Sequence, residues 1–128
     1  DAQSQEGKLV IDELVKNILV CNDKKLVLQE LDVDVSTMKN ICFSLINQYN
    51  NLCVVLATKK DKKIILNIAL SKNLVKDTSL NASQMISQVA RHINGKGGGQ
   101  AFFAVASGDV NKNIQRVFED VQKIITSC

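Results

Sequence analysis

Apolar residues recur along this chain at helical spacing in four places, and these repeats predict its helices. Two stretches place apolar side chains at offsets of 0, 3, 4, 7, 8 and 11, which forms one continuous face of an α-helix. Those two faces consist of Met38, Ile41, Cys42, Leu45, Ile46 and Tyr49, and of Ala82, Met85, Ile86, Val89, Ala90 and Ile93. Residues 8–20 and 114–125 carry shorter versions of the pattern, so we expect an amphipathic helix in each.

Short polar residues mark where these helices are expected to begin and end. Ser36, Asn81 and Asp109 are the predicted N-caps, because their side chains can accept a hydrogen bond from a first-turn N–H group. The Asn-Gly pair at residues 94–95 predicts a left-handed stop after the third helix. The Asn-Asp pair at residues 22–23 predicts the end of the first helix, at residues 8–20.

Four apolar runs between the helices predict β-strands, at residues 25–31, 52–57, 64–70 and 101–107. The order of apolar and polar residues in the first run is too irregular to fix its buried face. The second and third runs are joined by residues 59–63, a link so short that it predicts a hairpin. The predicted order is therefore α, then β-α-β-β-α-β-α. It indicates the α/β (α+β) fold class, with one mixed β-sheet and helices packed against it.

Length and composition indicate one domain with an aliphatic core, since 128 residues include only 4% aromatic side chains. We expect a globular domain at residues 22–128, with residues 1–21 as the end of a preceding helical region. The chain starts with Asp1 rather than Met, so we interpret it as a piece of something longer. It shows no secretory signal, and its apolar runs are too short to span a bilayer. These features predict a soluble protein with no membrane partner.

The cysteines and the single histidine argue against a metal site. Cys21, Cys42, Cys53 and Cys128 form no C-x-x-C pair, and His92 alone cannot complete a familiar Cys/His ligand set. Cys42 and Cys53 lie in apolar segments and are predicted to be small core residues. Free thiols of this kind suit a reducing compartment, so we expect a cytoplasmic protein.

The net charge of +3 conceals an uneven distribution of charged residues. Residues 1–34 carry eight acids against four bases, whereas residues 35–128 carry twelve bases against five acids. The body of the chain therefore has a net charge of +7, which is compatible with a polyanionic partner.

Residues 94–100 are the segment that composition does not explain, because four of the six glycines fall within five positions. Crowded glycines usually mark positive φ angles or close backbone approach to a partner, and their N–H groups can line an anion site. A nucleotide-binding loop needs its glycines after a strand and before a helix, and here a helix precedes them and a strand follows. We therefore expect no ATP or NAD site. The glycines alone leave open a partner contact or a flexible turn without one.

A family resemblance favours the partner contact. The glycine segment, followed by Phe103, Ala104 and Gly108, resembles the signature near the end of alanyl-tRNA synthetases, a domain type also found after the catalytic domain of DHH phosphoesterases. The order of elements is similar too, over about residues 22–127. Synthetases usually have an Arg-Pro-Asp-like run after the glycines, where this chain has Gln100, Ala101 and Phe102. Phosphoesterases usually have His there, so Gln100 favours the synthetase.

The resemblance implies a non-catalytic C-terminal domain of an alanine–tRNA ligase that binds the outer corner of tRNA(Ala). It also implies support for a homodimer, in which residues 1–21 would end the dimer-forming helical region, and a role in aminoacylation and editing. No DNA partner is expected. The implied tRNA-binding residues are Arg91, Gly95, Lys96, Gly97, Gly98, Gly99 and Gln100, with Lys96 neutralising a phosphate. We expect no cofactor in this piece, and ATP, Mg and Zn sites elsewhere in the parent enzyme.

Three other features have a functional and a structural interpretation. The lysine-rich residues 59–63 can bind phosphate or form a solvated turn, and the turn is favoured. His92 is expected at the surface or at a helix end rather than in a catalytic role. Phe102 and Phe103, as neighbours in a strand, should face opposite sides, with one in the core and the other either stacking on RNA or packing under a helix.

No catalytic arrangement emerges from the spacing of nucleophiles, bases and acids, so the piece is expected to be inactive by itself. Two other hypotheses remain open. One is the substrate-binding domain of a DHH-type phosphoesterase, which would carry Asp-His-His motifs upstream. The other is a protein-interaction domain without a nucleic-acid role.

Overall fold

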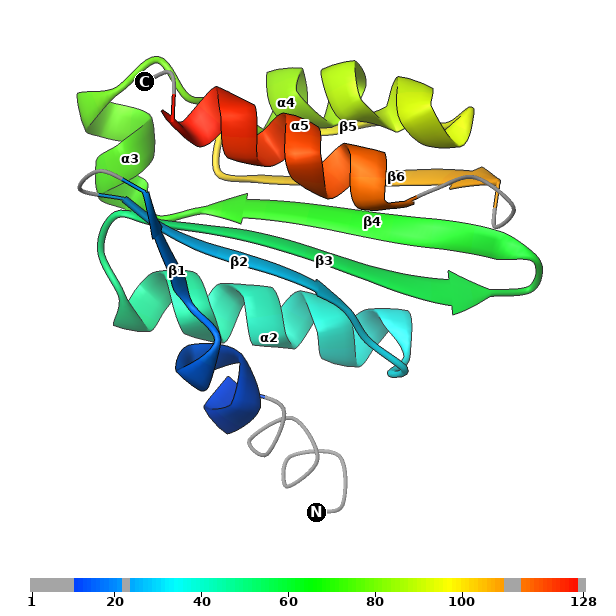
Figure 1. Ribbon diagram of the computed structural model, residues 1–128, viewed down its shortest axis with the longest axis horizontal. Helices are drawn as coiled ribbons and strands as arrows, with labels where there is room; N and C mark the ends of the chain where they lie inside the picture. Colours follow the sequence, from blue (N-terminus) through cyan, green and yellow to red (C-terminus); the bar gives the residue numbers. More distant parts are fainter. Residues whose placement is uncertain (1–10, 22–23, 110–113, 127–128) are drawn as a thin grey trace.

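The computed structural model describes residues 11–21, 24–109 and 114–126 (Figure 1). Its centre is a six-stranded sheet in the order β1-β2-β3-β4-β6-β5, in which β2 and β3 run parallel and the other neighbours antiparallel. The strands are β1 (Leu19–Cys21), β2 (Lys24–Glu30), β3 (Leu52–Lys60), β4 (Lys63–Leu70), β5 (Lys96–Gly99) and β6 (Phe103–Asp109). The helices are α2 (Val35–Gln48), α3 (Lys72–Asp77), α4 (Ala82–Val89), the 3-10 helix η1 (Ala90–Ile93) and α5 (Ile114–Thr126).

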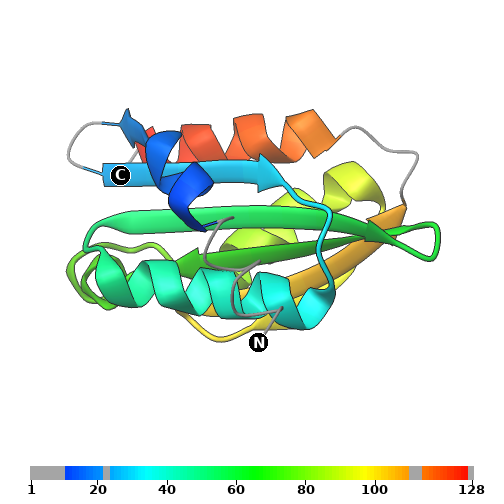
Figure 2. The ribbon, with the colours of Figure 1, turned by 90° about the horizontal axis from the view of Figure 1, so that it is seen from below.

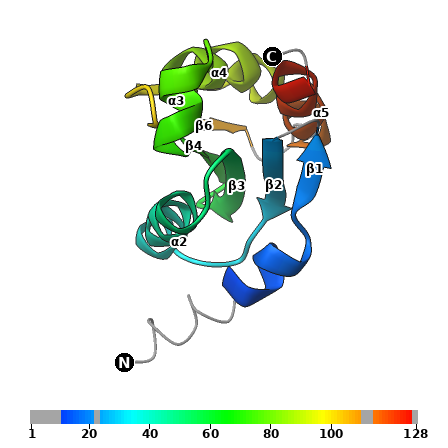
Figure 3. The same cartoon turned by 90° about the vertical axis from the view of Figure 1, so that its left-hand side faces the viewer.

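Helices cover both faces of the sheet, as Figure 3 shows from the side. Helix α2 packs on one face, which we call the α2 face, and α3, α4 and α5 lie on the other. Alternate residues of β3 therefore enter different cores, with Val54 packing towards α2 and Val55 towards α4 and α5. The irregular strand β2 is explained in the same way, because Leu26 and Val27 are buried on opposite faces. The predicted mixed fold and order of elements are confirmed.

The long helices form as their apolar patterns predict, while their caps are only partly as expected. Asn81 caps α4, since its side chain accepts a hydrogen bond from the Gln84 N–H group. Helix α2 begins two residues earlier than predicted, because Asp34 rather than Ser36 is its N-cap. The Asp34 carboxylate accepts from the Thr37 N–H group at 2.7 Å. Hydrogen bonds from Thr37 lower the pKa of Asp34.

The predicted cap of the last helix is wrong. Asp109 is the final residue of β6, paired across the sheet with Lys63, and its carboxylate accepts a hydrogen bond from the Asn94 side chain. Its short polar side chain was compatible with a cap, but strand pairing fixes its position instead. The apolar face predicted for α5 is confirmed, with Val117, Phe118, Val121 and Ile125 buried.

The predicted helix at residues 8–20 is too long. The helix covers residues 11–16 of the described chain, Asn17 is in a turn, and Leu19–Cys21 form β1. Residues 19–21 form a strand instead of continuing the helix because they pair antiparallel with β2, with Leu19 opposite Leu26. Leu14 is buried against the α2 side of the sheet, so residues 11–21 pack on the domain. Their assignment to a preceding helical region remains a prediction, and residues 8–10 and 22–23 lie outside the described chain.

The connection between β4 and α4 contains the short helix α3, which the sequence analysis missed. The predicted hairpin is confirmed, and its strands continue into the lysine-rich link as far as the Lys60–Lys63 pair. Among the described residues no helix is long and apolar enough to cross a membrane.

Candidate functional site

The glycine segment is an edge strand of the sheet rather than a loop. Residues 96–99 form β5 and pair antiparallel with β6, with Gly98 opposite Val105. Asn94 ends the preceding 3-10 helix in the left-handed conformation, as predicted, whereas none of the described glycines has a positive φ angle. The glycines are therefore needed for close approach and not for a turn.

The close approach involves every second glycine. A Cβ added at Gly97 would lie 2.5 Å from the Cα and Cβ atoms of Ala106, and one at Gly99 would lie 2.5 Å from the Phe103 carbonyl oxygen. Real Cβ atoms do not come within 3.0 Å of such neighbours. At Gly98, in contrast, nothing lies within 4 Å of the added atom. Gly97 and Gly99 are thus required by the sheet, while Gly98 leaves a bare stretch of backbone open on the α2 face.

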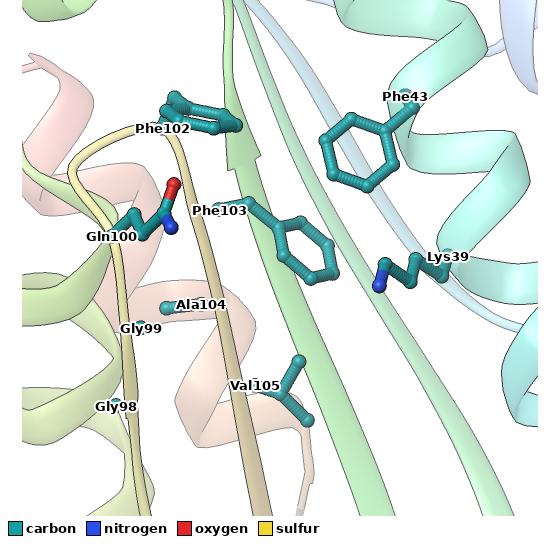
Figure 4. Close-up of a pocket in the computed structure, with 9 residues that line it drawn as sticks. All are labelled: Lys39, Phe43, Gly98, Gly99, Gln100, Phe102, Phe103, Ala104 and Val105. Atoms are coloured by element: carbon teal, nitrogen blue, oxygen red, sulfur yellow. The ribbon is translucent and has the colours of Figure 1, made fainter.

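That bare stretch borders a groove between α2 and the β5–β6 edge, with a volume of about 320 Å³ (Figure 4). Helix α2 makes its main sheet contacts with β3 and β4 rather than with β5 and β6. The groove is lined by Lys39, Phe43, Gly98, Gly99, Gln100, Phe102, Phe103, Ala104 and Val105.

Three aromatic rings form the apolar end of the groove. The Phe43 ring, from α2, lies 4.8 Å from the Phe103 ring and 6.3 Å from the Phe102 ring between centroids. The prediction that Phe102 and Phe103 face opposite sides is wrong, because Phe102 lies in the bend before β6 and escapes strand alternation. All three rings are only partly buried, so their faces remain available at the surface.

A single positive charge lies over these rings. The ammonium group of Lys39, which is exposed, is 5.9 Å from the centroids of both Phe43 and Phe103. Such contacts hold the cation at the mouth of the groove without neutralising it. The groove therefore combines apolar ring faces, one cation and an open backbone edge, a combination that suits a flat aromatic ligand carrying negative charge.

The structure brings only part of the predicted site to this groove. Gly98, Gly99 and Gln100 line it. Lys96 is exposed and, being paired with Ser107, points to the same face as Gly98 further along the strand.

The remaining predicted residues lie away from the groove. Gly97 faces the other side of the sheet, and Gly95 approaches the backbone of Ser107. Arg91, in η1, is exposed, and its Nε donates to the Gln88 carbonyl. The assignment of all seven residues to tRNA binding remains a prediction.

Sequence reasoning missed Lys39 and Phe43, which lie far from the glycines in the chain, and also Val105, which follows them closely. The available signal was Phe43, since an aromatic residue stood just outside the predicted apolar face of its helix. Nothing in the sequence distinguished Val105 from an ordinary residue of the predicted strand at 101–107. Only the packing of α2 beside β6 brings these residues together.

His92 has a structural contact rather than a place in the groove. Its Nε2 atom lies 3.2 Å from the Asp120 carboxylate and links η1 to α5. The predicted core thiols are confirmed, because Cys42 and Cys53 are fully buried. Burial raises the pKa of Cys42 to about 12 and raises the pKa of Cys53 further. Neither thiol is prepared for nucleophilic chemistry at neutral pH.

This fold and its glycine edge define a domain of the DHHA1 class. The DHHA1 domain family model matches residues 22–127, and the chain belongs to that family. Alanine–tRNA ligase of Cytophaga hutchinsonii is 32% identical over 124 residues, covering 96% of this chain and 14% of that protein. The corresponding protein of Christiangramia forsetii is 30% identical over 118 residues, covering 92% of this chain and 13% of the relative. The chain thus spans about one seventh of the length of these relatives.

Solved structures agree with this assignment. The C-Ala domain of Aquifex aeolicus alanyl-tRNA synthetase has a TM-score of 0.78 at 23% identity, covering 85% of this chain and 97% of that domain. An exopolyphosphatase-related protein from Bacteroides fragilis has a TM-score of 0.59 at 10% identity, covering 94% of this chain and 34% of that protein, a likeness of fold alone. The resemblance to the C-terminal domain of alanyl-tRNA synthetases is confirmed, and the chain is homologous to a synthetase accessory domain.

Proposed function

We propose that this chain is a tRNA-binding accessory domain of an alanine–tRNA ligase and that its groove contacts the outer corner of tRNA(Ala). The observation that carries the proposal is the groove itself, in which Phe43, Phe102 and Phe103 offer ring faces beside the ammonium group of Lys39. Base–aromatic stacking contributes about 1–3 kcal/mol per base, and it tolerates any base. Lysine adds attraction to the phosphate backbone.

The open backbone of the glycine strand β5 adds a second contact with RNA, beside the aromatic rings and Lys39. Because Gly98 has no side chain and open space around it, an RNA can approach the backbone of β5 closely. Gln100 adds an exposed amide at the same end, and amides can donate to base edges or phosphate oxygens. Lys96 extends the positive charge along the same face. Arg91, outside the groove, then serves as a peripheral cation.

The domain contributes binding rather than chemistry in this proposal. Aminoacylation and editing of tRNA(Ala), with ATP, Mg and Zn, belong to the rest of the parent enzyme, and so does the greater part of a homodimer contact. A domain that holds the corner of tRNA raises the local concentration of the acceptor end for both catalytic steps. The parent enzyme is expected in the cytoplasm.

The test is filter binding of the chain to alanine-accepting tRNA at about 150 mM salt. The controls are a tRNA with a disrupted corner, a single-stranded RNA of equal length and a DNA of the same sequence. We expect intact tRNA to bind at least about ten-fold more tightly than each control, and Lys39→Gln to weaken it several-fold. Lys123→Gln, in α5 on the face of the sheet opposite the groove, is the matched control variant. Equal weak binding of all four nucleic acids would contradict the proposal.

A further inference from the structure

We infer that the tip of the β3–β4 hairpin, residues 59–63, is a phosphate-binding arm that continues the groove's contact along the RNA backbone. The inference rests on the proposed function, because it adds a second contact to the same bound RNA. It reverses the interpretation of this tip as an ordinary solvated turn.

The tip concentrates positive charge that the described chain neutralises only in part. Four of its five residues are lysines, and all five are exposed. Lys59 forms an ion pair with Glu30 at 3.4 Å. Lys60 lies close enough to Asp34 to help lower the pKa of that carboxyl, whereas Lys62 and Lys63 have no ion pair among the described residues and remain for an anionic partner.

The arrangement of these lysines is unfavourable for the isolated domain. Lys60 and Lys63 are directly opposed across the hairpin, and like charges in such a pair repel. Asp61 and Lys62 occupy the two turn positions with φ angles of 52° and 67°, where Asn-Gly or Asp-Gly is strongly preferred. Holding a lysine in the left-handed region costs about 1 kcal/mol. Turn formation alone does not explain a lysine at this position, because glycine would form the turn at lower cost. Binding of the lysine to an anionic partner does explain it.

The side chains of Lys60 and Lys63 lie on the α2 face of the sheet, which also carries the groove. Residues directly opposed in antiparallel strands share a face, and alternation along β4 places Lys63 on the same side as Ile65, which packs towards α2. Lys60 opposite Lys63, and Lys96 opposite Ser107 on β6, therefore belong to this face. Figure 2 shows the hairpin reaching past the ends of its neighbouring strands.

The spacing fits a continuous strand of RNA. Val105 in the groove is opposed to Asn67, four residues along β4 from Lys63, a separation of about 13 Å at the usual strand rise. A nucleic-acid strand advances about 3.4 Å per nucleotide along its helix, so about four nucleotides cover this distance. An RNA held in the groove can thus reach the tip without distortion. Five lysines of this region, Lys59, Lys60, Lys62, Lys63 and Lys96, stand against four acids, Glu30, Asp34, Asp61 and Asp109, and leave an excess of one positive charge.

The experiment compares salt dependence of tRNA binding for the whole chain and for the variant Lys60→Gln/Lys62→Asn/Lys63→Gln. Asparagine tolerates the left-handed conformation at the turn, so the hairpin should still form. Each phosphate contact contributes about 0.9 to the slope of log affinity against log salt concentration. We expect the slope to fall by about 2 to 3 in magnitude, and the affinity at about 150 mM salt to fall at least ten-fold.

The control variant Lys72→Gln/Lys76→Gln/Lys123→Gln removes the same charge from α3 and α5, which pack on the face of the sheet opposite the groove. It should keep the unmodified slope to within about 1. A hairpin variant with an unchanged slope, or a control variant with the same loss, would overturn the inference while leaving the proposed function intact. An unmodified chain that does not prefer tRNA would overturn both. A hairpin variant that melts no lower than the unmodified chain shows that its weaker binding does not come from unfolding.

Discussion

Adding one methyl group at Gly97 should disrupt the edge of the sheet, while the same change at Gly98 should not. The two residues are neighbours in β5 and equally exposed, and they differ in what an added Cβ atom would meet. At Gly97 it would lie 2.5 Å from two atoms of Ala106, and one of these is backbone, so no side-chain rotation relieves the clash. At Gly98 it would enter open space.

The size of the effect follows from the displacement that the methyl group forces. The nearest atom to the added Cβ would be the Val105 carbonyl oxygen at 2.2 Å, so β5 must move away from β6 by about 1.2 Å to restore an ordinary 3.4 Å contact, which breaks hydrogen bonds of a four-residue ladder. Each such bond contributes about 1 kcal/mol net, and overpacking typically costs about 1–3 kcal/mol. We expect Gly97→Ala to lower the free energy of unfolding by about 2–3 kcal/mol. Gly98→Ala should change it by less than about 1 kcal/mol, with a small gain from reduced unfolded-state entropy.

Urea denaturation of both variants, followed by circular dichroism, measures this difference directly. Hydrogen exchange should in addition show faster exchange of β5 and β6 amides in Gly97→Ala alone. If both variants unfold at the same urea concentration as the unmodified chain, the close approach of Gly97 to Ala106 is not a feature of the folded molecule. If both are destabilised equally, a loss of glycine flexibility rather than a clash is responsible.

Three further predictions concern single side chains. Lys62→Gly creates an Asp-Gly turn and should raise the melting temperature by about 2–4 °C, because it relieves the positive φ angle; a lower melting temperature would contradict the strain. Asn67 is fully buried, and both its amide atoms lack a hydrogen bond in the described chain, with the weakly bonding thiol of Cys42 beside it. Asn67→Leu should therefore stabilise the fold by about 1 kcal/mol in urea denaturation, and a loss of stability would show an unseen partner. Hydrogen bonds from Thr37 lower the pKa of Asp34 below its ordinary 3.8, so its carboxylate stabilises α2 at neutral pH and this contribution disappears as the pH falls through the lowered pKa. Asp34→Asn should lose less thermal stability on acidification than the unmodified chain, and identical losses would contradict the cap's role.

The sequence was sufficient for those elements whose signal is local. Helices α2, α4 and α5 each carry an apolar face of several turns, and each face is buried as its spacing predicts. The hairpin followed from the short polar link, and Asn94 ended its helix as an asparagine before glycine should. Local signals failed where pairing decides the structure.

The elements that were missed depend on partners distant in the chain. Leu19–Cys21 continue a helical pattern, and only the free edge of β2 makes them a strand. Residues 96–99 have almost no strand propensity, and β5 exists because Ala104 and Ala106 leave room for a glycine backbone beside β6. The sequence predicted only part of the candidate site, because its other residues come from elements distant in the chain. Its glycines are visible as a motif, but Lys39 and Phe43 join them only through the packing of α2.

The most direct test of the central claim is a titration of the isotope-labelled chain with alanine-accepting tRNA, monitored by the backbone amide signals in NMR spectra. We expect the signals of Gly98, Gly99 and Gln100 to shift or broaden first, together with those of Lys39 and Phe43, while signals from α5, on the other face of the sheet, remain unchanged at equal RNA. Changes confined to other surfaces, or uniform changes over the whole domain, would contradict the assignment of tRNA binding to this groove.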